Sequence, residues 1–294
     1  IVTGGAGFIG SHIVNELIDE GYEVHVIDNL RSGKKENVNE KAVLHVVDIR
    51  DKEKLGPIFE HAKYVFHEAA LPQVQFSIEN PLETHEINVT GLLNVLEAAR
   101  TYNVKRCIFA ASSAAYGEQN ILPLVETMPA RPLSPYGAHK YIGEIYCSLW
   151  AKIYNMETVS LRYFNVYGPG QSSVGAYASV VAKFLDFKKD GMPLKITGNG
   201  EQTRDFVHVK DVVSANLKAM KSSKVGKGEV INIGSTHQSS VNEIARLIGG
   251  PTEYVEARIE PTNTQADIQK ARELLDWEPM ITIEDGIAEL VRLS

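Results

Sequence analysis

Tyr136 and Lys140, four residues apart, are side chains whose types and spacing could do chemistry. They stand at the head of an amphipathic stretch, where a helix places the phenol and the ammonium on one face. A phenol titrates near ~10, and a nearby positive charge favours its ionised form, which can act as a base. Lowering its pKa by ~3 units takes about 4 kcal/mol. Because Tyr-x-x-x-Lys also occurs as two ordinary surface residues, the interpretation depends on the rest of the chain.

A glycine-rich turn near the start of the chain is suited to hold a diphosphate. Gly4, Gly7 and Gly10 follow a short apolar strand at residues 1–2 and lead into an amphipathic helix. Without Cβ atoms, the backbone can approach a pyrophosphate at the helix N-terminus. The spacing differs from the common Gly-x-Gly-x-x-Gly fingerprint, so a glycine turn without a ligand is the alternative.

Polar side chains recur where predicted strands end. Asp28, at the tip of the second strand, can accept hydrogen bonds from a ribose diol and repel a 2′-phosphate, which favours NAD over NADP. Asp48 and Ile49 end the third strand and suit the edge and the face of an adenine. Ser112 and Asn165 follow the fifth and sixth strands. The strands are predicted at residues 1–2, 23–27, 43–47, 64–67, 106–111 and 158–162.

Strands that alternate with helices predict an α/β fold, a doubly wound parallel (Rossmann) sheet with ligands at the carboxyl ends of its strands. We expect this NAD-binding domain to comprise residues 1–165 and 206–235, and a smaller mixed α/β substrate domain to comprise 166–205 and 236–294. Other predicted elements include a loop at 166–173, a polar turn-rich stretch at 198–205, strands at 206–209 and 230–233, and helices at 81–102, 135–154, 177–188, 211–220, 241–248, 268–275 and 283–293.

Composition narrows the class of protein. The 294 residues are 44% hydrophobic and 23% charged, as in ordinary globular proteins, and the net charge of −7 argues against nucleic-acid binding. Cys107 and Cys147 have no metal-type spacing, so we expect core thiols in a reducing compartment and no metal site. No apolar run reaches membrane-spanning length and no signal peptide is present, which predicts a cytoplasmic protein. Because the sequence begins at Ile1 inside a strand pattern, we expect a few residues to precede it.

Five motifs, in this order, resemble the extended short-chain dehydrogenase/reductase family. Within that family they are most similar to the nucleotide-sugar 4-epimerases of the UDP-glucose (UDP-galactose) 4-epimerase type, and they cover nearly the whole chain. The motifs are Thr3-Gly4-x-x-Gly7-x-x-Gly10, Asp28-Asn29-Leu30, Ser112 with Tyr136-x-x-x-Lys140, Tyr163-Phe164-Asn165-x-Tyr167-Gly168-Pro169, and Arg204-Asp205-Phe206-Val207-His208-Val209-x-Asp211-Val212.

The resemblance implies an NAD-dependent isomerase that reversibly inverts C4 of a UDP-hexose through a 4-keto sugar. Tyr136 would take the proton of the 4-hydroxyl while hydride leaves C4 for the nicotinamide. Ser112 would hydrogen-bond the same oxygen, with Ser113 as its competitor for that role. Lys140 would bond the nicotinamide ribose and keep the phenol ionised. UDP-glucose and UDP-galactose are the expected substrates, and their N-acetylated forms are further candidates.

The resemblance also assigns residues to the cofactor and to the substrate. Thr264 matches a gatekeeper position, where a small side chain leaves room for an N-acetyl group. The cofactor residues are Gly4, Gly7, Phe8, Ile9, Asp28, Asn29, Asp48, Ile49, Ala69, Ala70, Asn88, Tyr136, Lys140 and Tyr163. The substrate residues are Ser112, Ser113, Asn165, Arg204, Arg258, Glu260 and Thr264, the two arginines binding the diphosphate.

Related reactions are distinguished by the residues after Ser112. The related 4,6-dehydratases carry an Asp-Glu pair where this chain has Ser113 and Ala114, and the related decarboxylases carry a glutamate in place of Ala114. Two alternatives stay open: an epimerase of another nucleotide sugar such as UDP-glucuronate, and a non-catalytic NAD-binding regulator. The long helices at 81–102 and 135–154 carry apolar residues on more than one face, and the family pairs such helices in a homodimer.

Overall fold

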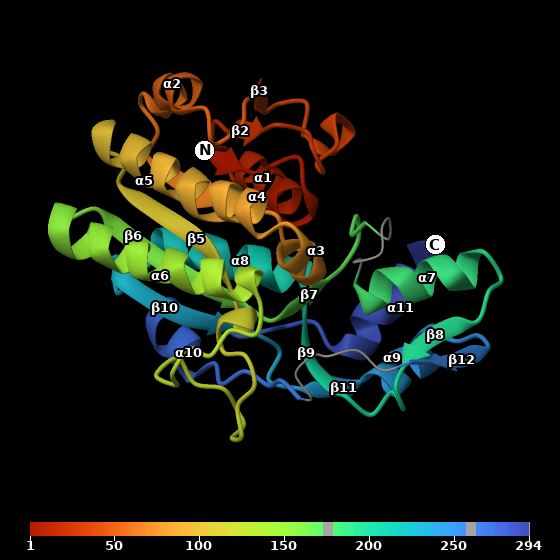
Figure 1. The fold of residues 1–294 in the computed structure, drawn as a ribbon. Helices are drawn as coiled ribbons and strands as arrows, with labels where there is room; N and C mark the ends of the chain where they lie inside the picture. The colour runs from red at the N-terminus through yellow and green to blue at the C-terminus, as the bar shows by residue number, and fades with distance from the viewer. Residues whose placement is uncertain (173–178, 257–262, 294) are drawn as a thin grey trace.

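The central sheet contains seven parallel strands among the described residues, in the order β10-β6-β5-β4-β1-β2-β3 (Figure 1). The structure is a computed structural model that describes residues 1–172, 179–256 and 263–293. The sheet confirms the predicted doubly wound architecture. Its strands are β1 (Val2–Thr3), β2 (His25–Asp28), β3 (Val43–Val46), β4 (Tyr64–His67), β5 (Arg106–Ser112), β6 (Glu157–Tyr163) and β10 (Lys227–Ile233).

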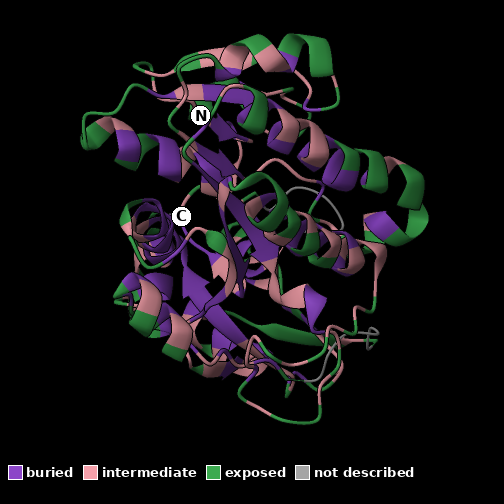
Figure 2. Ribbon diagram, turned by 90° about the vertical axis from the view of Figure 1, so that its left-hand side faces the viewer, coloured by how far each residue is buried: buried purple, intermediate pink, exposed green. Residues whose placement is uncertain are grey.

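Helices cover both faces of this sheet, so its central strands are buried on two sides, whereas the edge strand β3 leaves Val43 and Val46 exposed (Figure 2). Helices α5 (Gly91–Thr101) and α6 (Pro135–Tyr154) pack on one face, and α1 (Phe8–Asp19) and α8 (Val209–Lys221) pack on the other. Adjacent strand residues point to opposite faces. Phe66 accordingly joins the core beneath α1 and α8, whereas its neighbour Val65 joins the core beneath α5 and α6.

The predicted helix at 81–102 consists of three segments. Helix α4 (Pro81–His85) runs into a π-helical turn, Glu86–Thr90, and then into α5. The turn contains Asn88, whose side chain is 4% exposed and bonds both the N–H and the carbonyl of Leu71, at 2.8 and 3.0 Å. Single π turns in a helix commonly mark functional positions. This one fixes the chain that leaves β4.

The smaller part of the molecule is built on two further sheets. Strands β7 (Asn165–Tyr167) and β11 (Gln238–Ser240) flank β9 (Thr203–His208), and β8 (Leu194–Thr197) pairs with β12 (Thr252–Val255). A third apolar core, which includes Phe184, Phe206 and Ile244, lies between these sheets and their helices. The helices are α7 (Val180–Lys189), α9 (Val241–Ile248) and α11 (Ile283–Leu293), while α10 (Gln269–Leu275) packs against α8 and β10.

Two sequence expectations for this part are wrong. The predicted loop at 166–173 begins with strand residues, because Val166 pairs with Val207 across a large sequence separation. Strand β9 starts at Thr203, inside the stretch predicted as turn-rich, and ends at His208. The predicted domain boundaries at 165/166 and 205/206 fall inside β7 and β9, and the division into domains stays a prediction. The start of the helix predicted at 177–188 lies outside the described residues.

Both cysteines are buried free thiols, as expected for core residues. Burial raises the pKa of Cys107 to about 12, so this thiol stays protonated at neutral pH. Within the described ranges, no helix combines the length and the apolar character that a membrane span requires.

Candidate active site

The start of α6 positions Tyr136 and Lys140. Ser134 caps the helix by accepting a hydrogen bond from the backbone N–H of Gly137 at 3.2 Å, and Pro135 occupies the first turn. The backbone N–H of Tyr136 donates to Ser77 Oγ at 3.1 Å, which ties this turn to α3 (Val74–Glu79). The predicted helix bounds, 135–154, are confirmed. Tyr136 therefore lies in the first turn and Lys140 one turn further, as the spacing predicts.

Ser112 lies at the carboxyl end of β5 and meets the phenol of Tyr136. Its Oγ accepts a hydrogen bond from the backbone N–H of Ala114 at 3.2 Å, which leaves the hydroxyl hydrogen for another acceptor. Burial raises the pKa of Tyr136, and the hydrogen bond from Ser112 acts in the opposite direction. The structure thus brings together Ser112, the last residue of β5, and Tyr136, in the first turn of α6.

Lys140 is buried beneath Tyr136. Its ammonium donates to the carbonyl of Ala110 at 2.5 Å and lies 5.9 Å from the centroid of the Tyr136 ring. Burial lowers the pKa of Lys140, whereas the charge of Glu68 raises it. In the chain alone, burial leaves the phenol neutral, because desolvation outweighs the hydrogen bond from Ser112. An added positive charge near the phenol would favour its ionised form.

Glu68 is a site residue that sequence reasoning did not select. It follows β4, and its Oε1 accepts a hydrogen bond from the hydroxyl of Tyr163 at 2.9 Å. That hydroxyl in turn accepts from Asn216 Nδ2 of α8 at 2.7 Å. The signal available in the sequence was the position of an acidic residue directly after a parallel strand, where ligands bind.

The glycine-rich turn fits a diphosphate. Gly4 has a φ of +72°, and a Cβ there would lie 2.7 Å from the backbone N of Ala69. A Cβ on Gly10 would lie 2.3 Å from the carbonyl oxygen of Gly4, so the helix can approach the turn only with glycine. Gly7 is the N-cap of α1, and no side chain in the described part of the chain caps it. The positive end of this 12-residue helix, which begins with Phe8 and Ile9, is therefore open to an anion.

Two carboxylates lie at the ends of the neighbouring strands β2 and β3. Asp28 accepts hydrogen bonds from the backbone N–H groups of Ala6 and Leu30, at 3.0 and 2.8 Å, and so ties the strand end to the glycine turn. Asp48 accepts from Asn29 Nδ2 at 2.8 Å. A two-pronged contact from Arg50 holds the pKa of Asp48 well below its usual range. Both carboxylates lie where the sequence predicted a contact with adenosine.

The remaining predicted cofactor residues surround this edge of the sheet. Ala69 and Ala70 follow β4, and the backbone N–H of Ala69 donates to Thr3 Oγ1 at 3.3 Å. Ile49 packs tightly over Gly91, because a Cβ added at Gly91 would lie 2.5 Å from Ile49 Cδ1. Asn88 uses its amide to hold Leu71, so it acts on the site through the backbone after β4.

A buried aspartate organises the predicted substrate side. Asp205 accepts hydrogen bonds from the backbone N–H groups of Ser235, Thr236 and Ala266, at 2.6, 3.0 and 2.9 Å. Its own N–H donates to Thr264 Oγ1 at 3.3 Å.

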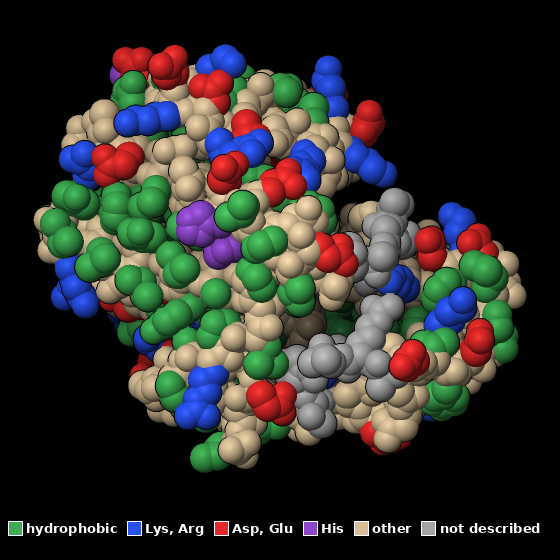
Figure 3. All heavy atoms as spheres, in the orientation of Figure 1, with side chains coloured by type: hydrophobic (Ala, Val, Ile, Leu, Met, Phe, Trp, Pro, Cys, Tyr) green, Lys and Arg blue, Asp and Glu red, His purple; other side chains and the backbone are tan. Residues whose placement is uncertain are grey.

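Asn165 and Arg204 lie beside these residues, on β7 and β9. Asn165 Nδ2 donates to the carbonyl of Asp205 at 3.3 Å, and Arg204 Nη1 donates to the carbonyl of Thr203 at 2.9 Å. The predicted residues Arg258 and Glu260 lie outside the described residues. Figure 3 shows the surface hollowed where this part of the molecule meets the larger one.

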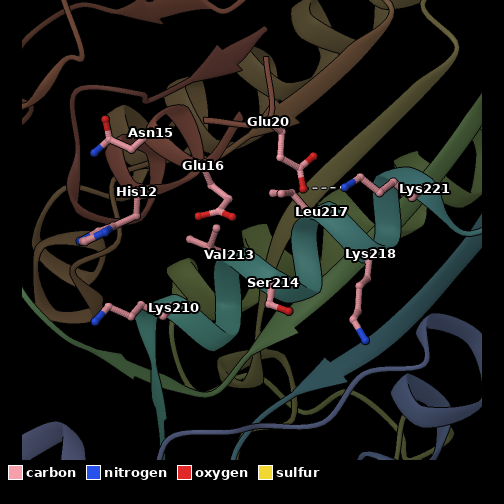
Figure 4. Close-up of a pocket in the computed structure, with 10 residues that line it drawn as sticks. All are labelled: His12, Asn15, Glu16, Glu20, Lys210, Val213, Ser214, Leu217, Lys218 and Lys221. Atoms are coloured by element: carbon pink, nitrogen blue, oxygen red, sulfur yellow. Dashed lines mark hydrogen bonds and ion pairs between the residues drawn. The ribbon is translucent and has the colours of Figure 1, made fainter. Parts of the chain in front are cut away.

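A separate groove lies between α1 and α8. It has a volume of about 430 Å³, and Figure 4 shows His12, Glu16 and Lys210 among its lining residues. None of its described lining residues is a predicted site residue. Helices α1 and α8 lie on the opposite face of the sheet from α6, so the groove is not part of the site around Tyr136.

The arrangement can remove a proton from a hydroxyl group. Tyr136 can accept the proton, Ser112 can donate a hydrogen bond to the same oxygen, and Lys140 supplies positive charge beneath them. The glycine turn and the two carboxylates fit a dinucleotide, which would supply the redox chemistry.

Comparison with known proteins gives the family. Residues 1–234 match the NAD dependent epimerase/dehydratase family. Over 303 residues the chain is 45% identical to a putative UDP-glucose 4-epimerase of Methanocaldococcus jannaschii, covering 99% of this chain and 96% of the relative.

Two solved structures are similar along almost their whole length. One is the UDP-glucose 4-epimerase of Thermotoga maritima with UDP-glucose, with a TM-score of 0.95 and 42% identity over 99% of this chain and 96% of that one. The other is the UDP-N-acetylglucosamine 4-epimerase of Methanobrevibacter ruminantium with UDP-N-acetylmuramic acid, with a TM-score of 0.94 and 36% identity over the same shares. These findings confirm the resemblance that the motifs indicated. The chain belongs to the NAD dependent epimerase/dehydratase family, and its cofactor is NAD.

Proposed function

We propose that this protein is a UDP-hexose 4-epimerase that interconverts UDP-galactose and UDP-glucose. The observation that carries the proposal is the meeting of Ser112, Tyr136 and Lys140 at the carboxyl end of β5, beside a glycine turn suited to a dinucleotide. A regulator that only binds NAD would need the glycine turn and Asp28, and nothing in its task would require the hydroxyl, the phenol and the ammonium together.

In this proposal the residues of the chain bind, orient and move one proton. Bound NAD would supply the redox chemistry, which is reversible hydride exchange with C4 of the sugar. Tyr136 removes the proton of the 4-hydroxyl and later gives it back, which makes it both general base and general acid. Ser112 donates a hydrogen bond to the same sugar oxygen. Lys140 would hold the nicotinamide ribose, and its charge favours the phenolate.

We propose that the substrate pocket also accepts N-acetylated hexoses. Thr264, which is 9% exposed and bonded to the backbone of Asp205, takes the gatekeeper role. Its small side chain supports activity on UDP-GlcNAc and UDP-GalNAc as well, and a similar solved structure is named a UDP-N-acetylglucosamine 4-epimerase. Thr264→Tyr should abolish turnover of the N-acetylated sugars and leave that of UDP-galactose within a few-fold. Equal loss on both sugars, or no turnover of UDP-GlcNAc by the unmodified protein, would reject this part.

The test of the function is direct. Purified protein supplied with NAD is mixed with UDP-galactose, UDP-GlcNAc or UDP-glucuronate, and the products are separated by chromatography. We expect UDP-glucose from UDP-galactose, and no product with Tyr136→Phe. Conversion of UDP-glucuronate alone would favour the alternative epimerase, while binding of NAD without turnover of any sugar would favour the regulator.

We further infer a homodimer that pairs the exposed face of α6. Tyr141, Ile145, Leu149 and Ile153 recur every fourth residue and are 36 to 64% exposed, and Figure 3 shows hydrophobic side chains gathered over this face. Ile145→Glu should convert a dimer into a monomer in light scattering. The matched control is Ile121→Glu, an exposed apolar residue outside the helix. A monomeric unmodified protein would contradict the inference.

A further inference from the structure

Glu68 connects three elements at the centre of the site. It follows β4, and its Oε1 accepts a hydrogen bond at 2.9 Å from the hydroxyl of Tyr163 at the end of β6. The same hydroxyl accepts a hydrogen bond at 2.7 Å from Nδ2 of Asn216 on α8. Asn216 is fully buried and also donates to the carbonyl of Val212 at 2.9 Å. Because Tyr163 pairs with Ser112 in adjacent strands, this chain of hydrogen bonds ends beside the hydroxyl that meets Tyr136.

The charged and titratable groups around Glu68 come from every neighbouring element. The positive charge of Lys140 on α6 lowers the pKa of Glu68. The negative charge of Glu68 raises the pKa of Tyr136 on the same helix. His67, the residue before it, is buried, and burial lowers the pKa of His67 to about 3, so that ring is neutral. Glu144 and Cys147 face Lys140 from α6.

The charge of Glu68 acts on the catalytic pair in a defined direction. Burial raises the pKa of Glu68 toward neutrality, against the hydrogen bond from Tyr163 and the charge of Lys140. When Glu68 is ionised, it raises the pKa of both Tyr136 and Lys140. A neutral Glu68 therefore lets the phenol ionise more easily.

We propose that Glu68 is a positioning residue that holds Tyr163 in place and whose charge state sets how readily Tyr136 loses its proton. The inference rests on the proposed function, because it gives Tyr136 the role of the base. Neutral Glu68 still accepts from Tyr163 through its carbonyl oxygen, so the geometry is kept while the charge changes. The residue acts through Tyr136 and Tyr163 and need not touch the substrate.

The test compares Glu68→Gln with the unmodified protein. Glutamine keeps the acceptor for Tyr163 and removes the charge. Titration of phenolate absorbance, with Tyr136→Phe subtracted to isolate one of the 12 tyrosines, follows Tyr136 without any turnover. We expect the Tyr136 transition to move about one pH unit lower in Glu68→Gln, and the acidic limb of kcat to move the same way. Glu253→Gln, an exposed carboxyl on β12, should move neither.

A second variant keeps the outcome decisive. Glu68→Leu removes the same charge together with the acceptor for Tyr163, so it should also move the Tyr136 transition to lower pH. This variant serves if Glu68→Gln fails to fold. An unmoved or raised transition in a folded Glu68→Gln protein would overturn the inference. If the unmodified protein converts no UDP-sugar, the proposed function fails, yet the phenolate titration still decides whether Glu68 controls Tyr136.

Discussion

Replacing Ser112 by alanine should weaken catalysis by a predictable amount. Its Oγ accepts the N–H of Ala114 at 3.2 Å, and its hydrogen bond to Tyr136 lowers the pKa of the phenol. A hydrogen bond to a charged group contributes about 1.5–3 kcal/mol. Because ~1.4 kcal/mol is a factor of ten in rate, Ser112→Ala should lower kcat roughly 10- to 150-fold. The pKa of Tyr136 should rise by about 1–2 units, which moves the acidic limb of the rate profile upward.

Ser113→Ala is the matched control, because the two serines are neighbours and compete for the same role. The assay is conversion of UDP-galactose to UDP-glucose across pH 5 to 10, with the acidic limb fitted for each variant. We expect Ser112→Ala to show the larger loss of kcat and the shifted acidic limb, and Ser113→Ala to lose less than about threefold. A larger loss in Ser113→Ala, or an unshifted limb in Ser112→Ala, would refute it.

Three further predictions concern the cofactor, acid stability and the core. Asp28→Ala removes the acceptor of two backbone N–H groups and the proposed ribose ligand, so NAD affinity measured by calorimetry should fall roughly 10- to 100-fold; unchanged affinity would exclude that ligand. Burial lowers the pKa of His139 to about 4, and the nearby ring of His85 contributes to this shift by charge repulsion. The unfolded chain therefore binds a proton from about pH 6.5 downward that the native chain refuses, and stability falls by about 3 kcal/mol toward pH 4. His139→Gln should flatten that part of the pH dependence in urea unfolding, and an unchanged slope would contradict it. Glu144→Gln breaks the buried pair with Arg162, whose Nε and Nη2 both donate at 2.7 Å, and should cost about 3–5 kcal/mol of unfolding free energy; a loss below ~1 kcal/mol would argue against the pair.

The elements that sequence predicted best have local signals. Helix α6 begins with Pro135, directly after its cap Ser134, and ends before Asn155, which adopts a left-handed φ of 53°. The capping serine, the proline in the first turn and the asparagine that ends the helix are all local signals, which can be identified from the sequence around each end. The central strands β4 and β5 of the large sheet are mostly apolar and buried because both faces are covered there.

The elements that sequence missed depend on distant partners. Among the residues that the structure describes, β8 and β12 pair with each other, Leu194 with Thr252, and each is only four residues long. The contact between Glu68 and Tyr163 joins residues 95 positions apart, so no spacing rule could reveal it. The organising role of Asp205 likewise depends on backbone groups near residues 235 and 266. Motif order identified the chemistry, whereas these supporting contacts required the fold.

The central claim is that the chain inverts C4 by moving its hydrogen to bound NAD and back. UDP-galactose carrying deuterium at C4 should be incubated with the NAD-loaded protein in ordinary water, and the UDP-glucose formed should be analysed by mass spectrometry and NMR. We predict that the product keeps the deuterium at C4. UDP-glucose that has exchanged its C4 deuterium for solvent hydrogen, or the absence of any UDP-glucose, would contradict the claim.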